Sequence, residues 1–257
     1  MSGPQFYTSP PHSVTVQGAY EPFDLQVARN QIMGHSTQNI YGFQTAVGAS
    51  TIPVWELATA YTYPVAATTM HLVSTVNTGA DLTATILIQG LDANYAPISE
   101  TIALNGTTVV TTTKSYLRIN AMSVASAVPT GTISLKDLTD TTTYAQITAN
   151  FGRSQAAIFT VPAGYTFYLS RVDAYTSANG NGTDFITYRN QQISSTGVIS
   201  YTQQAPFTQQ YHAQRVMPRP FTEKTDIQLQ AKSSSATTYN VAIAAEGYLI
   251  KNDSQSA

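Results

Sequence analysis

Residues 157–175 have the sequence AIFTVPAGYTFYLSRVDAY, in which two apolar runs are separated by Pro162-Ala-Gly164. The second run, from Tyr165 to Tyr175, alternates apolar and polar side chains with the period of two that is typical of a half-buried strand. In the turn, proline fixes φ and glycine accepts a positive φ. The stretch therefore predicts a strand, a tight turn and a second strand.

The same pattern recurs along the chain. Asn105-Gly106 lies between two such runs, 98–104 and 107–113, and this dipeptide is the strongest local signal for a β-hairpin. The short segment 24–32 is the only candidate for a helix. Strands spaced by about 8–12 residues are typical of sandwiches and barrels. We therefore predict an all-β fold of two antiparallel β-sandwich domains that are jelly-roll-like. The further strands are expected at 70–76, 82–91, 116–123, 132–138, 184–188, 198–202, 226–232 and 239–247.

Three segments are expected from the changes in pattern. Residues 1–35 are rich in proline near the start and show little periodicity, which predicts an extended N-terminal arm. The pattern resets near 150–154, so the two sandwiches are expected at 36–150 and 151–257. Apolar side chains of the arm, and a tryptophan that we expect to be buried where the arm meets the first domain, are the candidate interface residues: Phe6, Tyr7, Phe23, Leu25, Val27 and Trp55.

Composition limits the function. Only 26 residues are charged, 12 basic and 14 acidic, whereas a soluble domain carries about a quarter charged residues. Protein interfaces are depleted in charge and enriched in tyrosine, so the chain suits a subunit packed against others. The absence of a Lys/Arg stripe argues against nucleic acid as a partner. No segment has the length and apolarity of a membrane span, and the start does not resemble a signal peptide, so we expect synthesis in a host cytoplasm.

No catalytic, cofactor or metal site is predicted. The four histidines lack ligand spacing, and the chain has no cysteine. Gly34-His35-Ser36 lacks the context of a nucleophile motif and is expected to be a turn. Residues 179–184 resemble a calcium loop in composition only, and a hairpin tip is the preferred interpretation. Arg215, Arg219 and Lys224 form the only basic cluster, which is expected to be a solvated loop.

Several stretches resemble a family of virion structural proteins of tailed bacteriophages of the marine and cyanobacterial type. They cover nearly the whole chain, from about residue 21 to 250. The resemblance implies a location in the phage particle, and it brings no catalytic residues. The matching stretches are Pro22-Phe-Asp-Leu-Gln-Val-Ala-Arg29, Gly34-His-Ser36, Gln89-Gly-Leu-Asp-Ala-Asn94, Ser99 to Thr108, Thr111 to Arg118, Phe159 to Tyr165, Lys224 to Lys232 and Glu246-Gly247.

Two classes of function follow from composition and resemblance. The first is a non-enzymatic virion component, a cement or decoration protein of the head or a protein of the head–tail junction. Such a protein would bind the major capsid protein or other virion proteins as a homo-oligomer, with a trimer expected. The second class is a receptor- or carbohydrate-binding component of the tail or fibres, since exposed tyrosines can stack on sugars. An enzyme is the third possibility, and the missing site constellations argue against it.

Overall fold

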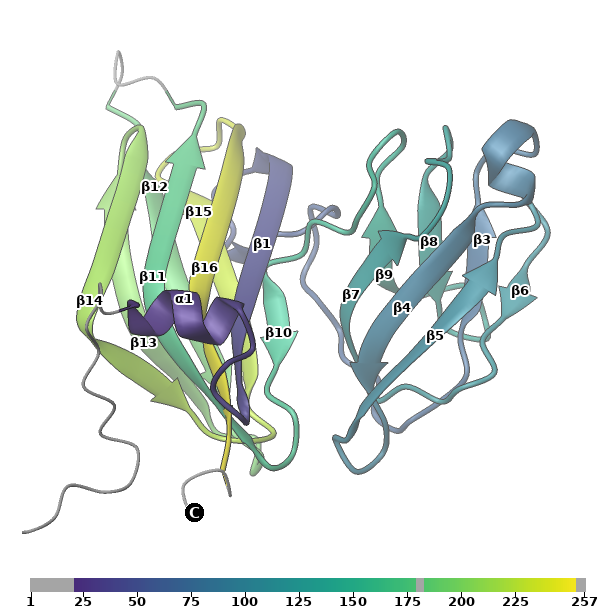
Figure 1. The fold of residues 1–257 in the computed structure, drawn as a ribbon. Helices are drawn as coiled ribbons and strands as arrows, with labels where there is room; N and C mark the ends of the chain where they lie inside the picture. Colours follow the sequence, from purple (N-terminus) through teal and green to yellow (C-terminus); the bar gives the residue numbers. More distant parts are fainter. Residues whose placement is uncertain (1–20, 179–182, 253–257) are drawn as a thin grey trace, which may run out of the picture.

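The computed structural model describes residues 21–178 and 183–252 of the chain (Figure 1). All strand pairs in these residues are antiparallel, so the predicted all-β, antiparallel fold is confirmed. The elements are α1 (Phe23–Ala28), β1 (His35–Val47), β2 (Ile52–Pro53), β3 (His71–Ser74), the 3-10 helix η1 (Gly79–Leu82), β4 (Thr85–Leu91), β5 (Pro97–Ala103), β6 (Val110–Thr111), β7 (Arg118–Val124), β8 (Ile133–Lys136), β9 (Thr143–Ile147), β10 (Ile158–Thr160), β11 (Tyr165–Thr176), β12 (Ile186–Ile193), β13 (Ile199–Phe207), β14 (Gln210–Phe221), β15 (Asp226–Ser233) and β16 (Tyr239–Lys251).

Two sheets share one core in the part that we call the main unit, residues 21–56, 155–178 and 183–252. One sheet has the order β1-β16-β11-β14, and the other has the order β10-β15-β12-β13 with β2 added on β15. Inward side chains of both sheets meet in this core, including Phe167 and Val172 of the first and Tyr188 and Leu229 of the second. The alternation in the sequence is the physical cause, because it gives every long strand one apolar face.

The remaining residues, 57–154, form a second body that we call the insert. Its sheets have the orders β6-β3-β8-β9 and β5-β4-β7, and a separate core that includes Leu72, Ile88 and Leu135 lies between them. Figure 1 shows the main unit and the insert side by side. Each body therefore has its own apolar interior.

Strand pairing divides the chain differently from the predicted domains 36–150 and 151–257. β1 pairs with β16 along most of its length, and β2 pairs with β15, so the first strands belong with the C-terminal half. Ile40 and Val47 of β1 are buried in the same core as Ile243. Burial of this apolar face holds β1 in the main unit, and the insert interrupts that unit between β2 and β10.

The predicted extended arm of residues 1–35 is wrong for its last part. Residues 23–28 are helical, and Val27 of this helix is buried. Pro22 precedes the first turn, where the missing N–H costs nothing, and Asp24 lies in that turn, where a negative charge is favourable. α1 lies across the outer face of the sheet that contains β16 and β11 (Figure 1). Residues 1–20 lie outside the described residues.

The hairpin predicted at Asn105-Gly106 is also wrong, although a tight turn is present. Gly106 has a positive φ, and Thr108 donates its N–H to Asn105 O at 3.0 Å. However, β5 pairs with β4 whereas β6 pairs with β3 in the other sheet. Gly106 N–H bonds Asp81 O, which fixes the turn against another segment and sends the chain from one sheet to the other. The turn predicted at Pro162-Ala-Gly164 is present, and it likewise leads from one sheet to the other, because β10 and β11 belong to different sheets.

The basic cluster was expected to be a solvated loop, but Arg215 and Arg219 lie in β14 and are half-buried. β14 is the last strand of its sheet, where proline is tolerated because one side of the backbone needs no ladder hydrogen bonds. Pro218 and Pro220 therefore do not end the strand as the sequence suggested.

Candidate functional site

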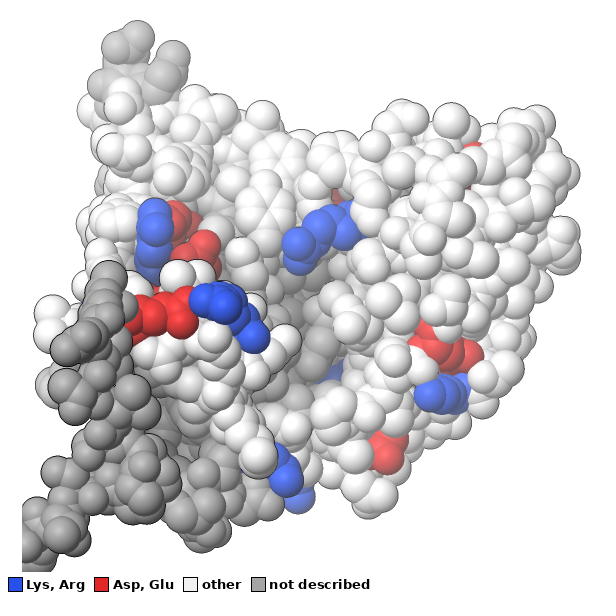
Figure 2. Space-filling view, viewed as in Figure 1, with Lys and Arg blue, Asp and Glu red and all other residues white. Residues whose placement is uncertain are grey.

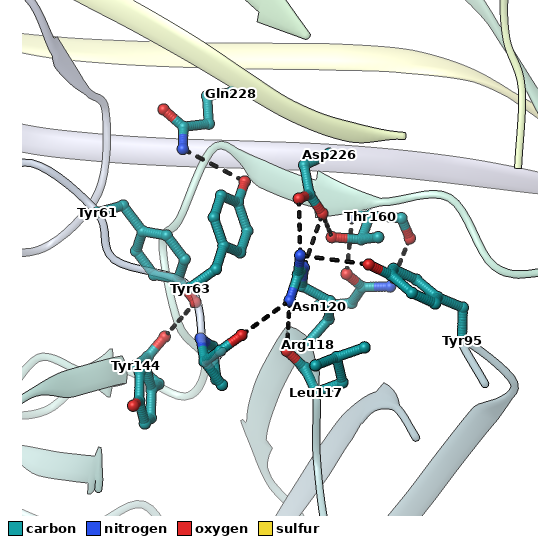
Figure 3. Close-up of polar contacts among 11 residues, drawn as sticks. Tyr61, Tyr63, Tyr95, Leu117, Arg118, Asn120, Tyr144, Thr160, Asp226 and Gln228 are labelled. Carbon is teal, nitrogen blue, oxygen red and sulfur yellow. Dashed lines mark hydrogen bonds and ion pairs between the residues drawn. The ribbon is translucent and has the colours of Figure 1, made fainter. Parts of the chain in front are cut away.

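The most developed group of polar contacts joins the insert to the main unit (Figure 3). Arg118 begins β7 in the insert, and Asp226 begins β15 in the main unit. The guanidinium binds the carboxylate with two hydrogen bonds, Nε to Oδ1 at 2.8 Å and Nη2 to Oδ2 at 3.0 Å. Only 11% and 7% of the two side chains are exposed. This is the bidentate geometry in which arginine recognises a carboxylate most strongly.

The rest of the guanidinium is also occupied. Its Nη1 donates to Pro64 O at 3.2 Å and to Leu117 O at 2.9 Å. Its Cζ lies 4.5 Å from the centre of the Tyr63 ring and 5.5 Å from that of Tyr95. Burial alone would lower the pKa of Arg118, but hydrogen bonds and charge from Asp226 outweigh it and raise that pKa. The cation is therefore permanent and fully used by the contact between the two bodies.

A second contact between the bodies imitates a strand pair. Asn120 of β7 donates its amide Nδ2 to Thr160 O at 3.0 Å, and Asn120 Oδ1 accepts the N–H of Thr160 at 2.9 Å. The Thr160 hydroxyl also donates to Asp226 Oδ1 at 2.6 Å. β7 and β10 are thus linked through one side chain where the sheets of the two bodies do not join.

Aromatic rings pack beside the ion pair. Trp55 and Tyr61 are in edge contact with ring centres 5.0 Å apart, and Tyr61 and Tyr63 follow at 4.9 Å. The Tyr61 hydroxyl donates to Tyr144 O at 2.9 Å, and burial raises the pKa of that hydroxyl. Trp55 is 2% exposed, so its predicted burial is confirmed. Its ring partner is Tyr61, and its indole Nε1 donates to Thr59 O at 2.9 Å, so both contacts are made with the segment that enters the insert.

We call this group of contacts between the main unit and the insert the joint. Glu56 also belongs to it and lies where the chain leaves the main unit. Its Oε1 accepts the backbone N–H of Gln155, on the segment that returns from the insert. Its Oε2 is buried without a hydrogen-bond partner among the described residues. Burial raises the pKa of this carboxyl to about 7, although the hydrogen bond from Gln155 acts in the opposite direction. The two crossing segments are therefore held together by a group that titrates near neutral pH.

These contacts give the joint a mechanical role. A buried ion pair, an amide pair and aromatic rings in edge contact join the same two bodies, and each contact requires its own geometry. Removing one partner of a buried ion pair is strongly destabilising, so such a pair resists separation of its partners. The joint holds the insert at a fixed position on the main unit.

A groove of about 770 Å³ lies on the outer face of the β1-β16-β11-β14 sheet, beside α1. Tyr168 and Tyr248 are direct cross-strand partners there, and the Phe23 ring packs on the edge of Tyr248 at 5.3 Å. Burial, together with the hydrogen bond to Asp24, raises the pKa of Tyr248 to about 12. The polar side chains of the lining carry both signs of charge, and they include Gln38, Asn39, Arg171, Gln214 and Glu246.

The predicted interface residues do not form one site. Phe6 and Tyr7 lie outside the described residues. Phe23 and Leu25 are 42% and 47% exposed on α1, while Val27 of the same helix faces its own sheet. Trp55 belongs to the joint. Nothing in these positions tests whether they contact a partner, so that role stays a prediction.

Residues 21–178 and 183–252 contain no group of three His, Cys, Asp or Glu side chains that could hold a metal ion. His71 and His212 instead contact single carboxylates, Asp140 at 3.0 Å and Asp173. Asp184, at the end of the glycine-rich stretch, accepts hydrogen bonds from Ser235 and Tyr239, and residues 179–182 lie outside the described residues. None of the helices in the described ranges is long and apolar enough to span a membrane.

The joint residues were missed by the sequence reasoning. Arg118 and Asp226 are 108 positions apart, and each begins an ordinary strand. A weak signal did exist, because charged residues are rare in this chain and each of these two stands at the start of a mostly apolar or neutral strand. That signal does not say which of the scattered charges pair.

Comparisons with known proteins give little. No family model matches this chain, and no curated protein matches it significantly. Two solved structures of infectious bursal disease virus are similar at very low scores. The Gx strain structure has 9% identity, covers 91% of this chain and 77% of its own, and has a TM-score of 0.21. The Gt strain structure has 8% identity, 90% and 78% coverage, and the same TM-score of 0.21. Scores this low carry no argument, so the resemblance to phage proteins stays a prediction.

Proposed function

We propose that this chain is a non-enzymatic structural subunit of a virus particle, and specifically a cement, decoration or other head-associated protein of a tailed bacteriophage. The observation that carries the proposal is the order of strands in the main unit. Apart from the two-residue strand β2, the main unit has eight strands, β1 and β10 to β16. Numbered 1 to 8 in chain order, they form sheets with the orders 1-8-3-6 and 2-7-4-5. This nested antiparallel order supports the interpretation of the main unit as a jelly roll.

Jelly rolls form viral capsid domains, but also lectins and cupins, so the fold alone does not decide between these functions. Surface composition favours assembly over a soluble role. Figure 2 shows that side chains other than Lys, Arg, Asp and Glu cover most of the visible face. Val65, Val216 and Met217 are 102%, 100% and 84% exposed. Neutral surfaces with exposed apolar side chains favour association with other subunits.

The joint supports a role in which the protein keeps neighbouring subunits at fixed distances. A cement protein must hold fixed distances between the subunits that it contacts, and the Arg118–Asp226 pair keeps the insert in one place on the jelly roll. Apolar side chains of the N-terminal segment would add a further contact with a neighbouring subunit. We expect a homo-oligomer, most simply a trimer, that binds the major capsid protein or a head–tail component.

The experiment is to measure oligomer mass and co-sedimentation with particles over a range of salt. Because the contacts would rest on apolar and hydrogen-bonding groups, binding should depend weakly on ionic strength, since screening acts on charges. A monomer that does not sediment with particles would contradict the proposal. Binding that is lost steeply with salt would contradict the neutral-surface part of it.

A second function, recognition of a host glycan by a tail or fibre component, is favoured by the groove. Tyr168 and Tyr248 lie side by side on the sheet, with Gln38, Asn39 and Gln214 in the same lining. Aromatic faces beside amide groups suit the apolar and hydroxyl faces of sugars. Glycan-array binding that is lost in Tyr168→Ala, with no affinity for particles, would favour this alternative over the first.

A further inference from the structure

The main unit has an open edge between β13 and β14. Each is the last strand of its sheet, and no backbone ladder joins them in the described residues. Side chains connect them instead. Arg215 donates from Nη2 to Gln203 Oε1 at 2.5 Å, and Arg219 donates from Nη1 to Thr202 O at 3.1 Å. The two arginines therefore lie between the edge strands of the two sheets and link them through side-chain hydrogen bonds.

Polar atoms without partners gather behind this edge. Tyr188 and Asn190 are 0% exposed. Five of the eight buried side-chain atoms that lack a hydrogen bond among the described residues lie here: Tyr188 Oη, Asn190 Nδ2, Asn190 Oδ1, Thr202 Oγ1 and Arg215 Nε. Four of them can donate a hydrogen bond. Buried donors are nearly always satisfied in native proteins, so a concentration of them indicates a missing acceptor.

The arginines need a negative partner as well. Within the described residues, no carboxylate lies within 4.0 Å of Arg215 or Arg219. Burial, and then the positive charge of Arg215, lower the pKa of Arg219. Two half-buried cations that repel each other and face unused donors form a site for an anion.

The neighbours of the two arginines on β14 identify the kind of ligand. Val216 and Met217, which lie between them in the sequence, are 100% and 84% exposed. A free inorganic ion would leave these apolar side chains in water. An acidic side chain on the surface of another protein would place its carboxylate at the two arginines, while apolar neighbours on that protein cover Val216 and Met217.

We propose that the β13–β14 edge is a docking site for a partner protein, and that a carboxylate of this partner binds to Arg215 and Arg219. Charge-assisted hydrogen bonds to arginine are about twice as strong as neutral ones. The partner's apolar neighbours would pack on Val216 and Met217. Only the nature of the partner, a virion protein, rests on the proposed function.

Acetate serves as the probe for the carboxylate site. Replacing chloride by acetate at constant ionic strength should raise the melting temperature of the full-length protein. Arg215→Gln and Arg219→Gln should each weaken the apparent affinity for acetate by at least about tenfold, because each removes charged hydrogen bonds. Arg153→Gln removes an exposed arginine elsewhere and should respond as the wild type does. The absence of any acetate effect in the wild type, or equal effects in all variants, would overturn the proposal.

Tyr188→Phe guards against variants that fail to fold. Without acetate, it should be at least as stable as the wild type, because it removes an unsatisfied buried hydroxyl. With acetate, it should be stabilised less than the wild type. A strongly destabilised Tyr188→Phe protein in chloride would mean that water already satisfies the hydroxyl, against the proposal.

The partner is tested separately, by incorporation into particles. Arg215→Gln and Arg219→Gln should be incorporated less well than Arg153→Gln. If acetate binding is lost but incorporation is normal, the carboxylate site stands and the virion partner does not. If no variant or wild-type protein enters particles, the proposed function fails while the acetate result still decides the site.

Discussion

Replacing Arg118 by methionine tests the joint most directly. The change keeps an apolar stem but removes the guanidinium, and it leaves the 7%-exposed Asp226 carboxylate with only the Thr160 hydroxyl as its side-chain partner. Breaking a buried ion pair by removing one partner costs about 3–5 kcal/mol. Loss of the ring contacts with Tyr63 and Tyr95 adds to this. We therefore expect the free energy of unfolding to fall by about 3–5 kcal/mol.

Urea unfolding followed by fluorescence is a suitable assay, because Trp55 is the single tryptophan and lies at the joint. The double variant Arg118→Met, Asp226→Leu should recover much of the loss, since apolar residues often replace a buried pair at little cost. Arg29→Met breaks an exposed pair with Glu21 and is the matched control, expected to cost less than about 1 kcal/mol. A similarly small cost for Arg118→Met would refute the view that the pair holds the two bodies together.

Three further predictions concern the main unit. Burial raises the pKa of Glu56 from 4.5 to about 7, so the folded state favours the protonated carboxyl. The free energy of unfolding should therefore be highest below about pH 4.5, fall as the pH rises toward 7 and stay constant above that. The change should amount to up to roughly 3 kcal/mol, and Glu56→Gln should abolish this part of the pH profile in denaturant unfolding; an unchanged profile would contradict the assignment. Gly42→Ala should lower the free energy of unfolding by about 1–3 kcal/mol, since its Cβ would lie 2.1 Å from Val54 O. Gly48→Ala, whose Cβ would have its nearest atom at 3.6 Å, is the control and should be tolerated in thermal unfolding. Equal effects of the two substitutions would contradict the close approach of Gly42 to Val54. Deleting residues 1–20 should leave the free energy of unfolding unchanged and reduce incorporation into particles. Deleting residues 1–30 should lower the free energy of unfolding by about 1.5–3 kcal/mol, which is the contribution of burying the Val27 side chain. Normal incorporation of both truncated proteins would show that the segment is not an anchor.

The sequence predicted the class of fold because strand formation is encoded locally. The alternation in 165–175 appears as β11, and the turn at Pro162-Ala-Gly164 lies where expected. Partner choice is not local. β1 pairs with β16 across some two hundred positions, so the interrupted main unit was divided wrongly. The Asn105-Gly106 turn was predicted, but the strands on its two sides belong to different sheets.

Sites were less predictable than strands. The burial of Trp55 could be predicted, since a large aromatic side chain in an apolar segment gains free energy when it leaves water. Arg215 and Arg219 were visible as a cluster, but two prolines nearby suggested a loop, and only the edge position of β14 explains why those prolines are tolerated. The pairing of Arg118 with Asp226 depends on how two separately folded bodies meet, and no local pattern carries that information.

The insert leaves and rejoins the main unit at almost one point. The Ala157 N–H donates to Val54 O at 2.8 Å, so the chain ends that flank the insert are already hydrogen-bonded to each other. A body attached in this way can be exchanged as a unit during evolution, because a few residues suffice to close the gap and both sheets of the main unit stay continuous. The same geometry makes this position a natural place to display a foreign domain.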